Sequence, residues 1–113
     1  MSFVTISLYL QHIMEALDKI ASFLQGIERD QFLASDLIQA AVIRELQVAG
    51  EAAKRITPEF QQTTPDIPWY EVTGTRDKLV HGYFDVDFEQ VWFTCRDDLP
   101  PLKQALGRIL DKK

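Results

Sequence analysis

Residues 3–24, FVTISLYLQHIMEALDKIASFL, decide the fold class of this chain. Their apolar side chains recur at alternating spacings of three and four residues, which is the period of one face of an α-helix. The stripe consists of Phe3, Ile6, Leu10, Ile13, Leu17, Ile20 and Leu24. The pattern therefore predicts a long amphipathic helix, and Gly26 shortly after it is a typical helix stop.

Three further segments carry the same helical period. In the second segment, Ser35 or Asp36 is suited to cap a helix. Its stripe is Ile38, Val42, Leu46, Ala49, Ala53 and Ile56. Residues 30–35 before it predict a short linker or a helical turn, whereas residues 57–68 after it hold three prolines and form the longest expected loop.

The third segment follows Pro68, a residue suited to the first turn of a helix, and Gly82 is its expected stop. Its stripe is Trp69, Val72, Arg76, Leu79, Val80 and Tyr83. In the fourth segment, Asp87 is the expected cap. The stripe of that segment is Phe88, Trp92, Cys95, Leu99, Leu102, Leu106 and Ile109. The helical phase continues across Pro100 and Pro101, which predicts one kinked helix or two nearly collinear pieces.

No segment alternates polar and apolar residues as a β-strand does. We therefore expect an all-α fold in a single domain over residues 1–113, an antiparallel four- to five-helix up-and-down bundle with a kinked C-terminal helix. A second line on the first helix, Tyr9, Ala16 and Phe23, has no partner in this bundle. In a small domain such a line favours dimerisation.

The composition limits the classes of protein to which the chain can belong. No apolar run reaches the roughly 18 residues that span a bilayer, and residues 2–10 lack the basic flank of a signal peptide. Cys95 is the only cysteine and there are two histidines, too few for a closed zinc site, so we expect a cytoplasmic protein without disulfide or cofactor. The net charge of −5 disfavours loose binding along nucleic acids, so a nucleic-acid role requires a localised site.

Arg76 interrupts the apolar stripe of the third helix between Val72 and Leu79. An unpaired guanidinium in such a position is costly, so a partner must hold it. One interpretation is a buried ion pair with a carboxylate of the second helix, either Glu45 or Glu51. The other interpretation depends on the residues that follow the arginine.

Arg76 opens the pattern Arg-x4-His-x-Tyr, which ends in His81, Gly82 and Tyr83. Five helical steps of about 100° place Arg76 and His81 about 140° apart, so the arginine must reach across or the helix must loosen near Gly82. Asp77 lies four residues before His81, shares its helix face and can orient the imidazole. Asp77 and the helix C-terminus both stabilise protonated His81, which favours a proton donor or acceptor near neutral pH. The alternative is an ordinary histidine at a helix end, with its charge in water.

These residues resemble HepT-like proteins of the HEPN superfamily, the toxin or ribonuclease half of bacterial and archaeal HEPN/MNT toxin-antitoxin pairs. The resemblance covers nearly the whole chain. Besides residues 76–83, it rests on Ala41-Val42-Ile43-Arg44, Gly50-Glu51-Ala52-Ala53-Lys54-Arg55, Ile67-Pro68-Trp69 and Asp98-Leu99-Pro100-Pro101-Leu102, in the order of that family's pattern. One position departs, because the family often has Asn directly after the motif arginine, where this chain has Asp77.

The resemblance implies a metal-independent endoribonuclease that acts as a homodimer, with the Arg-x4-His motifs of two subunits facing one another in a cleft. His81 would act as general base or acid around attack by the ribose 2′-hydroxyl, Arg76 would stabilise charge on the phosphate, and Asp77 would orient the site. Tyr83 would be the residue that a cognate MNT-type nucleotidyltransferase antitoxin modifies with AMP, which adds bulk and negative charge beside the RNA-binding cleft.

A second hypothesis, from another class of protein, stays open at this point. The chain would then be a non-catalytic helical module that binds and positions a nucleotidyltransferase, with residues 76–83 as the docking or nucleotide-contact surface. The remaining reactive side chains carry no motif. His12 is expected to face solvent or to pack beside the bundle, and Cys95 is expected to be a small buried hydrophobe without a nucleophilic role.

Overall fold

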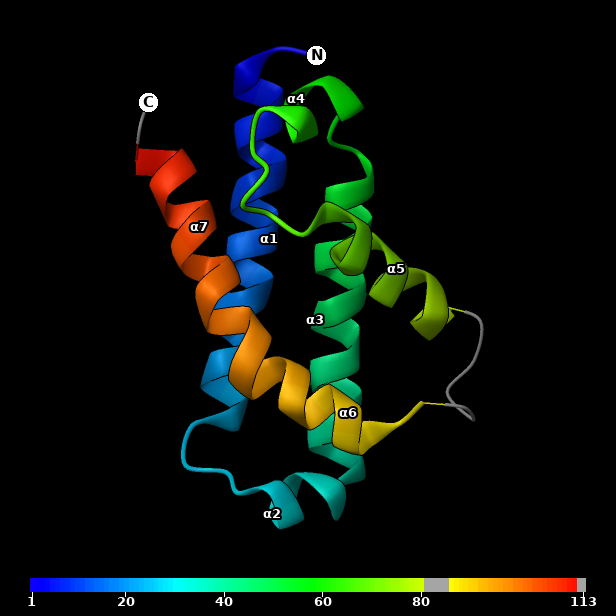
Figure 1. Cartoon of the computed structure of the whole chain (residues 1–113). Coiled ribbons are helices and arrows are strands. Elements are labelled where there is room, and N and C mark those ends of the chain that lie inside the picture. The colour runs from blue at the N-terminus through cyan, green and yellow to red at the C-terminus, as the bar shows by residue number, and fades with distance from the viewer. Residues whose placement is uncertain (81–85, 112–113) are drawn as a thin grey trace.

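The structure is a computed structural model that describes residues 1–80 and 86–111, with the backbone alone described for residues 75–80. Two long helices form its centre, α1 (Phe3–Leu24) and α3 (Asp36–Lys54). Figure 1 shows these two side by side, running in opposite directions, with short α2 (Arg29–Leu33) connecting them at one end.

Two outer helices complete the bundle. α5 (Trp69–Val80) packs against α3, and α7 (Leu99–Asp111) packs against α1 (Figure 1). The described residues form helices without any strand, so the predicted all-α bundle is confirmed. Within residues 1–80 and 86–111, no helix is both long and apolar enough to cross a membrane.

The predicted stripes form the hydrophobic core of the bundle. The largest fully buried side chains are Phe32, Leu10, Ile13, Leu17, Ile20, Ile43, Ile56, Leu106 and Val42. Phe3 is an exception within its stripe, because it is 44% exposed and its ring lies against that of Phe60. The placement of Ala16 on a free outer line is wrong. Ala16 is 1% exposed because it lies one helical turn from both Ile13 and Ile20 and faces the core with them.

Side-chain caps fix the starts of the helices where the sequence predicts them. Ser35 rather than Asp36 caps α3, since its Oγ accepts a hydrogen bond from the Ile38 backbone N–H at 3.1 Å. Asp87 caps α6 (Phe88–Phe93) in the same way, through a 3.1 Å bond from the backbone N–H of Gln90. Beyond the C-terminal end of α1, Gly26 adopts a left-handed φ of 74°, which explains why a glycine follows this helix.

One expected loop contains a helix. Residues 57–68 include α4 (Pro58–Gln62), in which Pro58 occupies the first turn and Thr57 Oγ1 accepts a hydrogen bond from the Phe60 N–H at 3.4 Å. A helix of five residues is too short to show an apolar period, so its cap Thr57 and its Pro58 are the signals from which it could have been predicted. The alternative of a helical turn in residues 30–35 is confirmed by α2.

The last helical segment is continuous across its proline pair. It consists of α6, the π-helical turn η1 (Thr94–Asp98) and α7. In the π-turn the backbone N–H of Leu99 donates to the carbonyl oxygen of Thr94, five residues earlier. Pro100 and Pro101 have no N–H to donate, and their rings would clash with the carbonyl groups four residues before them. The wider π-turn directly before the prolines relieves this clash. The irregularity that the sequence predicts at the proline pair is therefore present as one turn of π-helix between α6 and α7.

Phe32 holds α2 against α6. Its ring is 0% exposed and lies 5.6 Å from the Trp92 ring and 6.4 Å from the Phe88 ring, measured between centroids. On the surface beside this cluster, Arg29 of α2 forms an ion pair with Glu89 of α6. Exposed ion pairs contribute about 1 kcal/mol or less, so the buried aromatic cluster carries most of the contact.

We expect Phe32→Ala to lower the free energy of unfolding by about 3–5 kcal/mol, because it removes a fully buried ring and leaves a cavity. Urea denaturation followed by circular dichroism measures the change. Leu37→Ala is the matched control, since Leu37 is 80% exposed, and it should change stability by no more than about 0.5 kcal/mol. A Phe32→Ala protein as stable as the control would contradict the role assigned to this ring.

Cys95 lies in η1 and is 7% exposed, as expected for a small buried hydrophobe. Burial raises the pKa of its thiol to about 12, so the thiolate needed for nucleophilic attack does not form near neutral pH. The unfolded chain ionises this thiol at its ordinary pKa near 9, and the folded chain does not. The stability that comes from keeping the thiol neutral is therefore complete below pH 9 and is lost as the pH rises from 9 toward 12.

We therefore expect the difference in unfolding free energy between the unmodified protein and Cys95→Ala to be constant from about pH 6 to 8. Above about pH 9 the unmodified protein should lose about 1.4 kcal/mol per pH unit relative to the variant. Denaturation curves of both proteins across this range provide the measurement. Parallel pH profiles for the two proteins up to pH 11 would show that burial does not hold the thiol neutral.

Candidate active site

The start of α5 is anchored firmly to the rest of the bundle. Trp69, its first residue, is 7% exposed, and its indole Nε1 donates a 3.0 Å hydrogen bond to Thr64 Oγ1. Ile67, two residues earlier, is 4% exposed. Because an aromatic ring and an aliphatic side chain are buried at the same place, the direction in which α5 leaves the loop is fixed.

The structure places the first half of the predicted motif on this helix. α5 extends to Val80, and Arg76 and Asp77 lie in its last two turns, as the sequence predicts. Their side chains are outside the described part of the structure, and so are all atoms of His81 and Tyr83. The expectation that Gly82 ends the helix also concerns a residue outside the described ranges. The grouping of Arg76, Asp77, His81 and Tyr83 into one site therefore stays a prediction.

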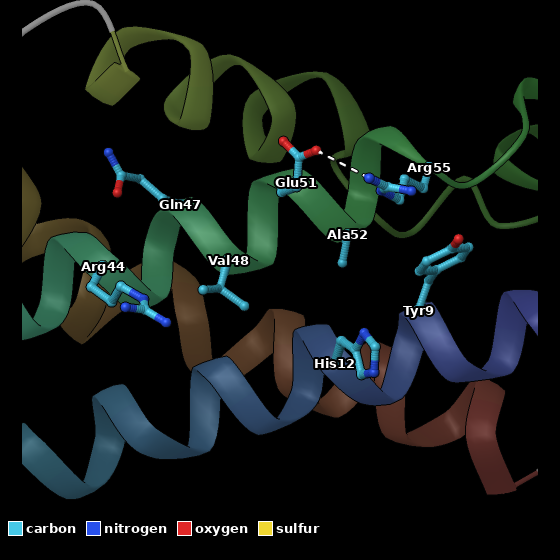
Figure 2. A pocket seen from close by; sticks show the side chains of 8 residues that line it. All are labelled: Tyr9, His12, Arg44, Gln47, Val48, Glu51, Ala52 and Arg55. Atoms are coloured by element: carbon cyan, nitrogen blue, oxygen red, sulfur yellow. Dashed lines mark ion pairs between the residues drawn. The ribbon is translucent and has the colours of Figure 1, made fainter.

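Polar side chains of α3 face the helix that carries the motif. Figure 2 shows Gln47 and Glu51 extending from α3 toward α5. A carboxylate oxygen of Glu51 lies 3.8 Å from Nη2 of Arg55, and both side chains are about half exposed. Glu45, the other carboxylate considered as a partner for Arg76, is buried on α3 and forms no ion pair among the described residues. The predicted ion pair of Arg76 itself involves a side chain that is not described.

A groove of about 560 Å³ runs between α1 and α3. Figure 2 shows that Tyr9 and His12 point into it from α1, whereas Arg44, Val48 and Ala52 line it from α3. The rings of Tyr9 and His12 meet edge to face with 6.3 Å between centroids. His12 is exposed, which agrees with its predicted position facing solvent.

This groove was not among the features predicted from the sequence. Its signal was present in two separate spacings, because Tyr9 and His12 are three residues apart, and Arg44, Val48 and Ala52 follow one another at steps of four. Each spacing predicts a shared helix face. That the two faces meet depends on the register in which α1 packs against α3, and no local pattern specifies this register.

Comparisons with known proteins show which family the chain is similar to. Residues 13–109 match the family model described as "Ribonuclease HepT-like". The chain is 44% identical over 101 residues to "Probable ribonuclease HepT" of Thermococcus cleftensis, covering 89% of this chain and 92% of the relative. It is 38% identical over 105 residues to "Putative RNase MJ1216" of Methanocaldococcus jannaschii, covering 93% of this chain and 87% of the relative. No solved structure shows significant similarity to the chain.

The family model covers far more than half of the chain, and the relatives are similar over nearly their whole length. The match includes α1 from Ile13 onward, all of α3 and α5, and the segment with the proline pair, so it does not depend on the short motif alone. The chain therefore belongs to the HepT-like ribonuclease family.

Proposed function

We propose that the chain is an endoribonuclease whose catalytic residues are Arg76, Asp77 and His81. The observation that carries the proposal is the Arg-x4-His-x-Tyr pattern within a chain of the HepT-like ribonuclease family. The anchored start of α5 supports it, because a helix fixed at Trp69 gives Arg76 and Asp77 a rigid base about 10 Å further along the helix.

In the proposed reaction, the ribose 2′-hydroxyl oxygen attacks the neighbouring phosphorus, and the bond from phosphorus to the 5′-oxygen of the next nucleotide breaks. A base accepts the proton of the 2′-hydroxyl, and an acid donates a proton to the leaving 5′-oxygen. The products are a 2′,3′-cyclic phosphate and a free 5′-hydroxyl. Arg76 stabilises the negative charge that builds up on the phosphate oxygens, and Asp77 orients the imidazole of His81.

This reaction uses an acid and a base at the same time, and each chain has one histidine in the motif. A homodimer in which two motifs face each other across a cleft supplies both, with one His81 accepting a proton and the other donating one. The nucleophile belongs to the RNA, so the proposed reaction requires no metal ion.

The proposed biological role is that of a toxin in a HEPN/MNT toxin-antitoxin pair. A cognate nucleotidyltransferase would then neutralise the ribonuclease by transferring the AMP group of ATP to the hydroxyl oxygen of Tyr83. The bond from this oxygen to the α-phosphorus forms, the bond between the α- and β-phosphates breaks, and pyrophosphate leaves. The added phosphate places negative charge and bulk beside a cleft that must accept a polyanion, so modification would block RNA binding through repulsion and through lost space.

We expect the purified, unmodified protein to cleave transfer RNA or total RNA in the presence of EDTA. His81→Ala should lower the rate by about 10²- to 10⁴-fold, because a general acid–base group is lost. Arg76→Ala should lower it by about 10²- to 10³-fold through loss of charge stabilisation. Cleavage time courses on denaturing gels, with end-group analysis for the cyclic phosphate, provide the measurement.

Arg108→Ala is the matched control for these variants, because Arg108 is an exposed arginine on α7 rather than on α5, and it should cleave at the unmodified rate. Full cleavage by either motif variant would contradict the residue assignment. A well-folded, unmodified protein that cleaves none of these RNAs but forms a stable complex with a nucleotidyltransferase would favour the non-catalytic partner-binding module instead.

A separate prediction concerns the control by AMP. Co-expression with the cognate nucleotidyltransferase should raise the intact mass of the chain by AMP groups, and peptide mapping should locate them on Tyr83. Tyr83→Phe should stay unmodified and should still cleave RNA when the partner enzyme is present at a level too low to bind every chain. Tyr9 and Tyr70 are internal controls, and AMP on either of them in place of Tyr83 would contradict the assignment.

A further inference from the structure

The groove between α1 and α3 gathers polar and charged side chains around an apolar floor. Its floor consists of Val48 and Ala52. The exposed guanidinium of Arg44 extends over the space between the two helices, and no described residue forms an ion pair with it. The groove thus offers a cation and the two rings of Tyr9 and His12 to an external ligand.

Arg55 adds a second cation at the other end of the groove. Its contact with Glu51 is 3.8 Å long and exposed to solvent, so it is a weak ion pair that a stronger anion can replace. Arg44 and Arg55 are eleven residues apart on one helix, which corresponds to about 16 Å along its axis. About five stacked nucleotides of a single strand cover that length at about 3.4 Å per nucleotide.

We infer that the α1/α3 groove binds single-stranded RNA and holds the substrate outside the Arg-x4-His motif. Nucleic-acid strands are bound without sequence preference by cations that contact the phosphates and by aromatic rings on which bases stack. Here Arg44 and Arg55 would contact phosphates, and Tyr9, supported by His12, would stack on a base. The inference deepens the proposed ribonuclease function and rests on it for the identity of the substrate.

The charges of the groove favour a polyanion over a second copy of the chain. In a symmetric dimer through this face, the same patch of both copies would meet itself. Each patch carries two arginines against one carboxylate, Glu51, so two patches of net positive charge would be brought together. A strand of RNA instead supplies the opposite charge at every phosphate. The net charge of −5 means that the chain as a whole repels nucleic acid. Binding of RNA therefore depends on a local concentration of cations such as this one.

The groove and the motif helix lie on different sides of α3, with α5 on one side and the groove on the other (Figure 2). A strand that reaches from the groove to α5 must cross α3, whose diameter with side chains is about 10 Å. Together with the length of the groove, this amounts to about 26 Å, or about eight nucleotides. RNA of about eight nucleotides or more should therefore use the groove, whereas a dinucleotide cannot.

The first test measures binding without cleavage. A fluorescein-labelled single strand of fifteen 2′-O-methyl nucleotides has no free 2′-hydroxyl, so the protein cannot cut it, and anisotropy gives its Kd. Arg44→Glu should weaken binding at least tenfold and reduce the slope of log Kd against log salt concentration by about 0.7, since one phosphate contact to a single strand is lost. Tyr9→Ala should weaken binding about fivefold or more, and Tyr9→Phe should retain it.

Arg108→Glu is the matched control, because it makes the same change in net charge on an exposed residue of α7. Equal weakening by Arg44→Glu and Arg108→Glu would overturn the inference, since general repulsion would then explain both. Light scattering on the same samples tests whether a second copy of the chain occupies the groove instead. If Arg44→Glu or Tyr9→Ala converts a dimer to a monomer, the groove is an interface between two copies and the inference is wrong.

A second test separates this inference from the proposed function. In cleavage assays, Arg44→Glu should raise KM for a fifteen-nucleotide RNA about tenfold or more, with kcat unchanged and with dinucleotide cleavage unaffected. If dinucleotide cleavage is lost as well, Arg44 belongs to the reacting site, and the inference of a separate RNA-binding groove is wrong. If no RNA is cleaved but the uncleavable strand binds through Arg44, the proposed ribonuclease activity is wrong, and the inference that the groove binds single-stranded RNA is supported.

Discussion

The packing of α1 against α3 is the constraint on which the other elements depend. α7 docks on α1 and α5 docks on α3, so neither outer helix has a surface to cover until the central pair has formed. The side chains at the centre are fully buried, among them Leu10, Leu17 and Val42. Each such side chain contributes about 1.5–3 kcal/mol when it leaves water. The ion pair from Lys103 of α7 to Asp18 of α1, at 2.8 Å and partly exposed, contributes about 1 kcal/mol or less. Burial rather than charge therefore holds the bundle together.

At the proline pair, the packing of the bundle overrides the local tendency of proline to end a helix. Pro100 and Pro101 oppose a regular helix, yet Leu99 and Leu102 on either side of them are both buried. Ending the helix before the prolines would remove the following apolar residues of α7 from their place against α1. The chain keeps the direction of the helix and changes its hydrogen-bond pattern for one turn instead. The same turn brings Cys95 into the core, where the thiol stays protonated.

Much of the fold could be predicted from the sequence, because its signals are local. Ser35 and Asp87 cap helices through bonds to residues three positions away, and the apolar period marks each long helix. Features that depend on contacts between distant segments could not be predicted. Phe3 has the right spacing for the core, but it lies at an end of α1, where its ring lies against that of Phe60 and stays 44% exposed. The motif residues Arg76 and His81 were visible as a spacing, whereas the groove required knowledge of which faces of α1 and α3 meet.

The division of α3 into separate faces explains how one helix can serve the core and two surfaces. At about 100° per residue, Val42, Leu46 and Ala53 fall on one side and form the core contact. Arg44, Val48, Ala52 and Arg55 fall within a sector about 80° wide that borders the groove, and Gln47 and Glu51 fall on the adjoining sector that faces α5. A substitution at Arg44 or Val48 therefore changes the groove without replacing Gln47 or Glu51, which line the groove and also face α5. A larger side chain at Ala53, which is fully buried, would instead disturb the core contact. Because Arg44 borders the groove on the side away from α5, changes in strand binding can be separated from changes in the reacting groups on the motif helix.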